Sequence, residues 1–174
     1  NLASITIPDS VTNIGQWAFS ECTSLTNIII PNSVTKIEES VFCRCESLIS
    51  ITIPNDLTTI GVDAFGGCCN LKSVTIPDTV TIIEDCAFGG CKNLTHVTLP
   101  SGITKIGSYA FSGCASLTEV VIPESVIEIG GNAFSNCKNL KKIRGKFAQD
   151  NGRCLIKDGK LIAFAPAELT QYTI

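Results

Sequence analysis

Leucine recurs along this chain at a fixed interval of 23 residues. Seven repeats start at the leucines Leu2, Leu25, Leu48, Leu71, Leu94, Leu117 and Leu140. A period of roughly 20–50 residues is the signature of a solenoid, in which each repeat forms one coil that stacks on the next. The interval therefore predicts a repeat solenoid built from 23-residue coils.

Within each repeat, the same kinds of residue return at the same positions, counted from the leucine as position 1. Positions 1 to 7 read L-x-x-I-x-I-P, an alternation of apolar and polar residues that predicts a short strand ended by proline. The V-T-x-I segment predicts a second short extended piece, and A-F-x-x-C-x-x-L predicts one or two helical turns. Stacked coils would pair the strands into a parallel sheet, giving a mainly β fold with short helical turns.

The full motif, L-x-x-I-x-I-P-x-x-V-T-x-I-G-x-x-A-F-x-x-C, resembles the BspA-like, or Treponema pallidum-type, class of leucine-rich repeats. The resemblance covers almost the whole chain. It departs from the commoner leucine-rich pattern at position 9, where this chain has Ser, Thr, Asp or Gly in place of a ladder of Asn or Cys. The resemblance implies a surface or secreted protein, of a bacterium or a protozoan parasite, that takes part in adhesion.

The repeat pattern fails after Leu140. Two apolar segments, 154–157 and 160–163, flank Asp158-Gly159, a dipeptide that favours a two-residue β-hairpin turn. The sequence therefore predicts a β-hairpin insertion near the C-terminus.

We expect this irregular insertion to span about residues 145–168, with the next repeat beginning at Leu169. On this interpretation residues 1–174 are a single leucine-rich-repeat domain and a fragment of a longer array. Both ends would lack the polar caps that a solenoid requires, which predicts possible end-to-end self-association.

Composition and charge limit the possible partners. Hydrophobic residues make up 44% and charged residues 17% of the chain, which favours a globular protein, and no apolar stretch is long enough for membrane insertion. Residues 1–137 carry 5 basic and 13 acidic side chains, whereas residues 138–174 carry 8 and 3. The basic end is either a patch for an acidic partner or a set of charges that protects a strand edge. Aromatic residues do not interleave with these charges, so no nucleic-acid site is predicted.

Position 21 holds cysteine in every complete repeat: Cys22, Cys45, Cys68, Cys91, Cys114 and Cys137. Their separation does not match the close C-x2-C spacing of metal sites, so we predict no metal. Cysteine is a small apolar side chain, and this column predicts reduced thiols buried beside phenylalanine and leucine. Four further cysteines lie outside the column and are expected to be exposed and oxidisable: Cys43, Cys69, Cys86 and Cys154.

The sequence contains no recognisable set of catalytic residues. His96 is the only histidine, and it falls at an outward strand position, whereas the nearest cysteine, Cys91, belongs to the inward column. A catalytic histidine would need a nucleophile beside it. We therefore predict that the chain is not an enzyme and uses no cofactor.

The face of the predicted sheet is the remaining candidate site. Positions 3 and 5 of each strand point away from the core, and solenoids commonly bind partners through such a surface. The candidate ligand-binding residues are Ser73, Thr75, His96, Thr98, Glu119, Val121, Lys142 and Arg144. Threonine at position 5 also has a purely structural explanation, because cross-strand threonine pairs suit a sheet.

We therefore predict a non-catalytic protein-binding or adhesion module of a cell-surface or secreted bacterial protein. Its partner would be a protein or another host or matrix macromolecule that contacts the sheet face. The alternative prediction is an architectural spacer that holds other domains away from the surface.

Overall fold

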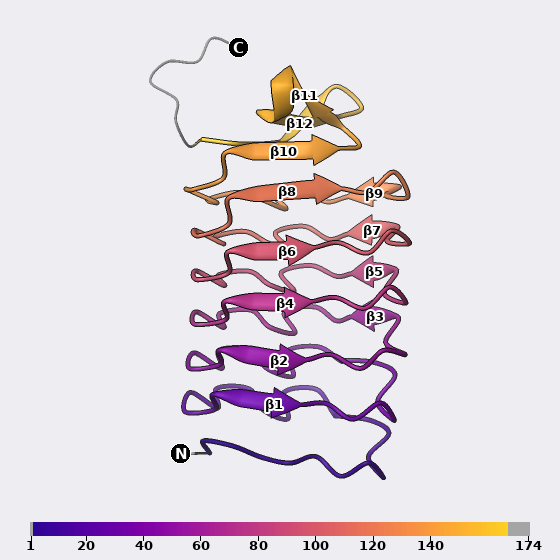
Figure 1. Ribbon diagram of the computed structural model, residues 1–174, viewed down its shortest axis with the longest axis vertical. Helices are drawn as coiled ribbons and strands as arrows, with labels where there is room; N and C mark the ends of the chain where they lie inside the picture. Colours follow the sequence, from indigo (N-terminus) through magenta and orange to yellow (C-terminus); the bar gives the residue numbers. More distant parts are fainter. Residues whose placement is uncertain (1, 167–174) are drawn as a thin grey trace.

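The computed structural model describes residues 2–166 of the chain. These residues form a stack of coils along one long axis, with one repeat in each coil (Figure 1). The predicted repeat solenoid is confirmed. The repeat that was predicted to begin at Leu169 lies outside the described residues.

The L-x-x-I-x-I-P segments form the first ladder of short strands. These strands are β1 (Asn27–Ile29), β2 (Ser50–Thr52), β4 (Ser73–Thr75), β6 (His96–Thr98), β8 (Glu119–Ile122) and β10 (Lys142–Gly145). Three parallel pairs, β1–β2, β4–β6 and β8–β10, place equivalent repeat positions opposite each other. The strands lie one above another along the stack, as the common register of the repeats requires (Figure 1).

The V-T-x-I segments form a second ladder beside the first (Figure 1). It comprises β3 (Thr59–Ile60), β5 (Ile82–Ile83), β7 (Lys105–Ile106) and β9 (Glu128–Ile129), joined as one parallel sheet. Single bridges from Ile14 to Ile37 and from Ile37 to Ile60 continue it toward the N-terminus. The predicted second extended piece is therefore present in each of the six complete repeats.

The segment predicted to form helical turns folds differently, and the part of the chain that the structure describes contains no α-helix. Position 16 adopts the left-handed conformation in every complete coil, and so does position 20, for example at Trp17 and Glu21 with φ of 64° and 60°. Two left-handed residues four positions apart are incompatible with a right-handed helix. The segment instead forms successive tight turns.

These turns link each coil to the next through what we call the turn ladder. The N–H groups at positions 16, 18 and 20 donate to carbonyls at positions 15, 17 and 19 of the following coil. Phe65, for example, donates to Ala87 at 2.8 Å, and the distances at all five junctions lie between 2.7 and 3.2 Å. The turn segment thus satisfies alternate N–H groups between coils, where an α-helix would satisfy them internally.

Two side-chain columns fill the core inside this turn ladder. The position-18 rings stack from Phe19 to Phe134 with centroids 5.2–5.5 Å apart. In the position-21 column, each thiol from Cys45 onward donates to the phenylalanine carbonyl of the coil below, as Cys91 does to Phe65 at 3.3 Å. The described cysteines are free, and the column is buried from Cys45 onward, as predicted.

Burial also controls the acidity of these thiols. It raises the pKa of Cys45 to about 12 and that of Cys137 to about 11, and it raises the pKa of Cys91 well above the usual thiol range. Desolvation penalises the thiolate, so the column stays protonated near neutral pH. Because the thiolate is the reactive form, these cysteines are poor nucleophiles.

The exposure predicted for the off-column cysteines is wrong for two of them. Cys43 is buried against the next coil, where its thiol donates to the Asp63 carboxylate at 3.1 Å. Cys154 is buried because its strand packs against the last coil. Cys69 and Cys86 are partly exposed.

Hydroxyl groups explain the unusual position 9. Ser33, Thr79 and Ser125 each donate to the position-10 carbonyl of the preceding coil, at 2.6–2.7 Å. These side chains join neighbouring coils, which is the task that an asparagine ladder performs in the commoner pattern.

A three-stranded antiparallel sheet ends the described chain. It contains β11 (Ala148–Gln149), β12 (Cys154–Lys157) and β13 (Lys160–Phe164), with a short 3₁₀ helix, η1 (Asp150–Gly152), between the first two. Asp158 and Gly159 have φ of 50° and 73°, as the predicted two-residue hairpin requires.

This sheet lies on the last coil and buries Leu155, Ile162 and Ala163 against the core. The uncapped C-terminal end was predicted for the repeat that begins at Leu169, which lies outside the described residues. End-to-end self-association stays a prediction.

Candidate binding face

The first ladder of strands presents a continuous outward face, here called the strand face, made of the side chains at positions 3 and 5. In β1, β2 and β4 the central residue is buried and its two neighbours are exposed. Strand alternation produces this pattern, since successive side chains point to opposite sides of the sheet. All eight predicted ligand-binding residues are exposed on this face.

The middle of the strand face carries small neutral side chains. Ser73 lies opposite His96, and Thr75 lies opposite Thr98, across the β4–β6 pair. The Nδ1 atom of His96 is 2.9 Å from the Thr95 hydroxyl, which holds the imidazole beside the strand. This region offers hydroxyl and imidazole groups for hydrogen bonding.

The C-terminal part of the strand face carries charge. Glu119 lies opposite Lys142 and Val121 lies opposite Arg144 across the β8–β10 pair. Arg144 also forms an ion pair with Glu119 on the diagonal, and their side chains are 54% and 45% exposed. An exposed pair of this kind stabilises a fold by about 1 kcal/mol at most. A partner that binds both charges would therefore lose little free energy by breaking the pair.

The arrangement suits contact with an extended surface rather than chemistry on a small molecule. His96 is exposed whereas Cys91 is fully buried, so the two do not form a catalytic pair. Within residues 2–166 no group of three or more potential metal ligands comes together. The same residues contain no helix with the length and apolarity needed to cross a membrane.

The strand face extends further toward the N-terminus than the predicted residues. Ile29 is 69% exposed at position 5 of β1, and Thr52 continues the same column in β2. The sequence-based selection favoured the C-terminal half because its charges stand out there. The signal for the remainder was present, since positions 3 and 5 are outward in every repeat.

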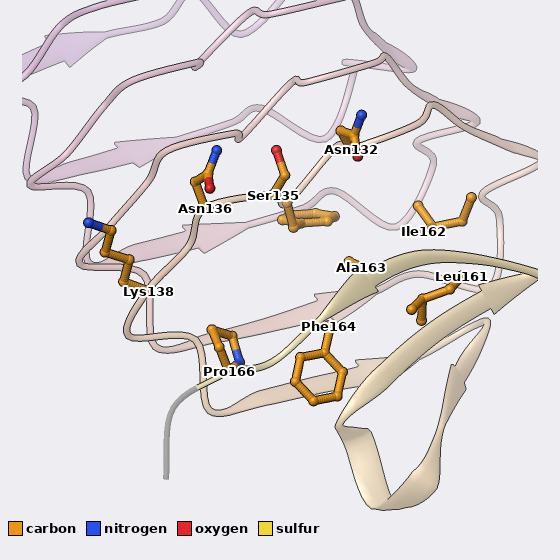
Figure 2. A pocket seen from close by; sticks show the side chains of 10 residues that line it. Asn132, Ser135, Asn136, Lys138, Leu161, Ile162, Ala163, Phe164 and Pro166 are labelled. Atoms are coloured by element: carbon orange, nitrogen blue, oxygen red, sulfur yellow. The ribbon is translucent and has the colours of Figure 1, made fainter. Parts of the chain in front are cut away.

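A cleft between the last coil and the hairpin was also missed. Its walls come from residues 132–138 and from β13 with the residues that follow it (Figure 2). The broken repeat spacing marked this region as irregular, but it did not indicate a cavity.

Stacked 23-residue coils, a ladder of short parallel strands and inward phenylalanine and cysteine columns define a leucine-rich-repeat solenoid. Comparison with protein families identifies the type, because residues 1–75 and 58–149 match the BspA type leucine rich repeat region. The chain belongs to this family, whose repeat domains are typically non-catalytic.

Solved structures of bacterial proteins share the fold. A leucine-rich repeat protein from Bacteroides ovatus is 34% identical with a TM-score of 0.79, and the match covers 90% of this chain and 44% of that one. A leucine rich cell surface protein from Faecalibacterium prausnitzii is 31% identical with a TM-score of 0.73, over 94% and 54% of the two chains. The T. pallidum leucine rich repeat protein is 29% identical with a TM-score of 0.53, over 81% and 57%.

The chain thus spans about half the length of these structural relatives. No curated protein matches the sequence.

Proposed function

We propose that this chain is a non-catalytic binding module of a bacterial cell-surface or secreted protein, and that it holds a macromolecular partner on the strand face. The observation that supports this proposal is the uninterrupted row of exposed position-3 and position-5 side chains along the stack. The surface location rests on similarity to the cell surface protein of Faecalibacterium prausnitzii.

The geometry favours a large partner such as a host or matrix protein. A standard interface buries about 800 Å² on each side, which is more than one coil can offer, so a partner would touch several coils at once. The face is poor in aromatic side chains, so recognition would be polar, with Glu119, Lys142 and Arg144 as charged anchors. Adhesion to cells or to matrix is the function that such a surface would serve.

The alternative function is an architectural spacer. The turn ladder is the feature that favours it, because three backbone hydrogen bonds at each of five junctions join the coils into a stiff stack. A spacer needs this stack and its length but no particular side chains on the strand face. The two functions therefore differ in what substitutions on that face would do.

A triple variant tests the proposal: His96→Ala, Glu119→Ala and Arg144→Ala. Removing both members of the ion pair avoids an unpaired charge, so the melting temperature should hardly change. Binding to immobilised matrix proteins, or adhesion of coated beads to host cells, should fall strongly.

The matched control carries Asn13→Ala, Glu21→Ala and Arg44→Ala, which removes one neutral side chain and another exposed inter-coil ion pair away from the strand face. The control should bind like the unmodified chain. Equal loss from both triple variants, or no loss from either, would refute the proposed site and favour a spacer.

A further inference from the structure

The turn ladder stops at the last complete coil. Asn132, Phe134 and Asn136 occupy its donor positions there, yet their N–H groups have no acceptor within residues 2–166. One coil below, the equivalent N–H groups of Tyr109, Phe111 and Gly113 donate to carbonyls at 3.1, 2.8 and 2.8 Å. The same backbone row is therefore satisfied at five junctions and open at the sixth.

The hairpin explains why the row is open. Strand β13 lies where the next turn segment would stack, and its Ile162 and Ala163 help to bury the Phe134 side chain, which is only 1% exposed. The backbone of β13, however, pairs with β12 in an antiparallel ladder. The hairpin thus covers the last coil with apolar side chains but offers no carbonyls to the donor row of that coil. Unpaired N–H groups near a buried side chain cost free energy.

The open row borders a cleft of about 460 Å³ (Figure 2). Asn132, Phe134, Ser135, Asn136 and Lys138 form one wall of this cleft. The other wall is apolar and consists of Leu161, Ile162, Ala163, Phe164 and Pro166. Leu161 is 48% exposed although it is a large apolar side chain, so it contributes accessible apolar surface beside the backbone donors.

We propose that this cleft binds a peptide segment of a partner protein in the conformation of a turn segment. Alternate backbone carbonyls of the peptide would accept hydrogen bonds from the N–H groups of Asn132, Phe134 and Asn136. At each of the five lower junctions the accepting carbonyls belong to a segment of tight turns, so a peptide that takes up this turn conformation matches the donor row.

The chemistry of the cleft favours a peptide over other ligands. At every lower junction this backbone row binds the carbonyls of a turn segment, and main-chain hydrogen bonds are a recurring way of recognising peptides. Leu161 and Phe164 suit a small or apolar side chain on the peptide, and the exposed Lys138 beyond Asn136 suits an acidic group near one end. This site lies on the turn side of the coil and does not depend on the strand face.

Amide hydrogen exchange measured by NMR on the 174-residue chain tests the proposal. In the free protein, the amides of Asn132, Phe134 and Asn136 should exchange fast, while those of Tyr109, Phe111 and Gly113 should be protected. The probe is a synthetic peptide with the sequence Ile-Gly-Gly-Asn-Ala-Phe-Ser-Asn, copied from residues 129–136, which contains the carbonyls that accept these bonds one junction below. At about nine times its Kd, the peptide should slow exchange of the three open amides about ten-fold.

A variant separates the cleft from other surfaces. Leu161→Asp should weaken binding of the probe peptide at least about ten-fold, which corresponds to 1.4 kcal/mol. The control is Ile127→Asp, which changes another exposed apolar residue away from the cleft and should bind the peptide normally. Protection of Tyr109, Phe111 and Gly113 in both variants would show that the coils remain folded.

Three results would overturn the proposal. The first is protection of the three amides without peptide, which would mean that other residues of the chain itself already fill the row. The second is no change in their exchange at millimolar peptide. The third is equal weakening of binding by Leu161→Asp and Ile127→Asp.

Discussion

Phe88→Ala should be strongly destabilising, because Phe88 lies in the middle of the aromatic column. Its side chain is fully buried, and its ring stacks on Phe65 at 5.2 Å and on Phe111 at 5.3 Å. Truncating a buried phenylalanine costs about 3–5 kcal/mol through lost burial and the cavity that remains. For a chain of this size, losing about 1 kcal/mol of unfolding free energy lowers the melting temperature by about 2–4 °C, so a decrease of roughly 6–20 °C is expected.

The measurement is a pair of denaturant melts with Thr75→Ala as the control. Thr75 is exposed on the strand face, opposite Thr98, so its truncation should cost less than about 1 kcal/mol. Phe88→Leu separates volume from aromaticity, since it keeps much of the buried apolar volume and should cost less than the alanine variant. Similar losses for Phe88→Ala and Thr75→Ala would refute the assignment of inward and outward columns.

Three other predictions concern cysteines and backbone conformation. In native protein, a thiol reagent should label the partly exposed Cys86 quickly and the buried Cys91 slowly, as peptide mapping can show. Burial raises the pKa of Cys137 from 9.0 to about 11, so its contribution to stability is complete below pH 9 and is lost as the pH rises through 11. Urea melts at pH 8 and pH 11 should therefore show a smaller alkaline loss for Cys137→Ala than for the unmodified chain. Gly159→Ala should destabilise the hairpin by about 1 kcal/mol because φ is 73° there, whereas Gly131→Ala, which has open space and no positive φ, should not be destabilising in thermal melts.

The columns of the solenoid were predictable because every position is sampled several times. A single phenylalanine in one window says little, but phenylalanine at position 18 of six successive repeats leaves only an inward position for it. The same argument placed the cysteine column and the exposed residues of the strand face. Stacking at a fixed interval also determined that both ladders would be parallel.

The turn segment was harder to predict, because apolar residues three apart fit tight turns as well as a helix. The deciding feature is left-handed backbone at position 16, which holds Trp17, Asp63, Cys86 and Tyr109 in different coils. Trp, Cys and Tyr do not favour that conformation, although Gly67, Gly90 and Gly113 at position 20, which is also left-handed, do. The turn ladder imposes it, since hydrogen bonds to the next coil offset the cost of the left-handed backbone.

The off-column cysteines show a second limit of the sequence. Cys43 belongs to no column of cysteines, yet it is buried, and its thiol donates a hydrogen bond to Asp63 in the next coil. Cys154 is buried only because β12 lies on the end of the stack. Both outcomes depend on contacts that occur once in the chain, and a repeat pattern reports only features that recur.

The strand face recurs with every repeat, whereas the cleft occurs at one place, and the two therefore offer different groups to a partner. Along the regular coils, every backbone donor of the turn ladder is satisfied, so a partner can find specificity only in exposed side chains such as those of Glu119 and Arg144. At the hairpin the stack continues its apolar core but interrupts its hydrogen bonds, which leaves backbone donors beside Leu161 and Phe164. An irregular repeat therefore creates a kind of site that the regular repeats cannot offer. In an array of this family, we expect peptide-binding clefts beside hairpin insertions. We expect recognition through side chains along uninterrupted rows of strands.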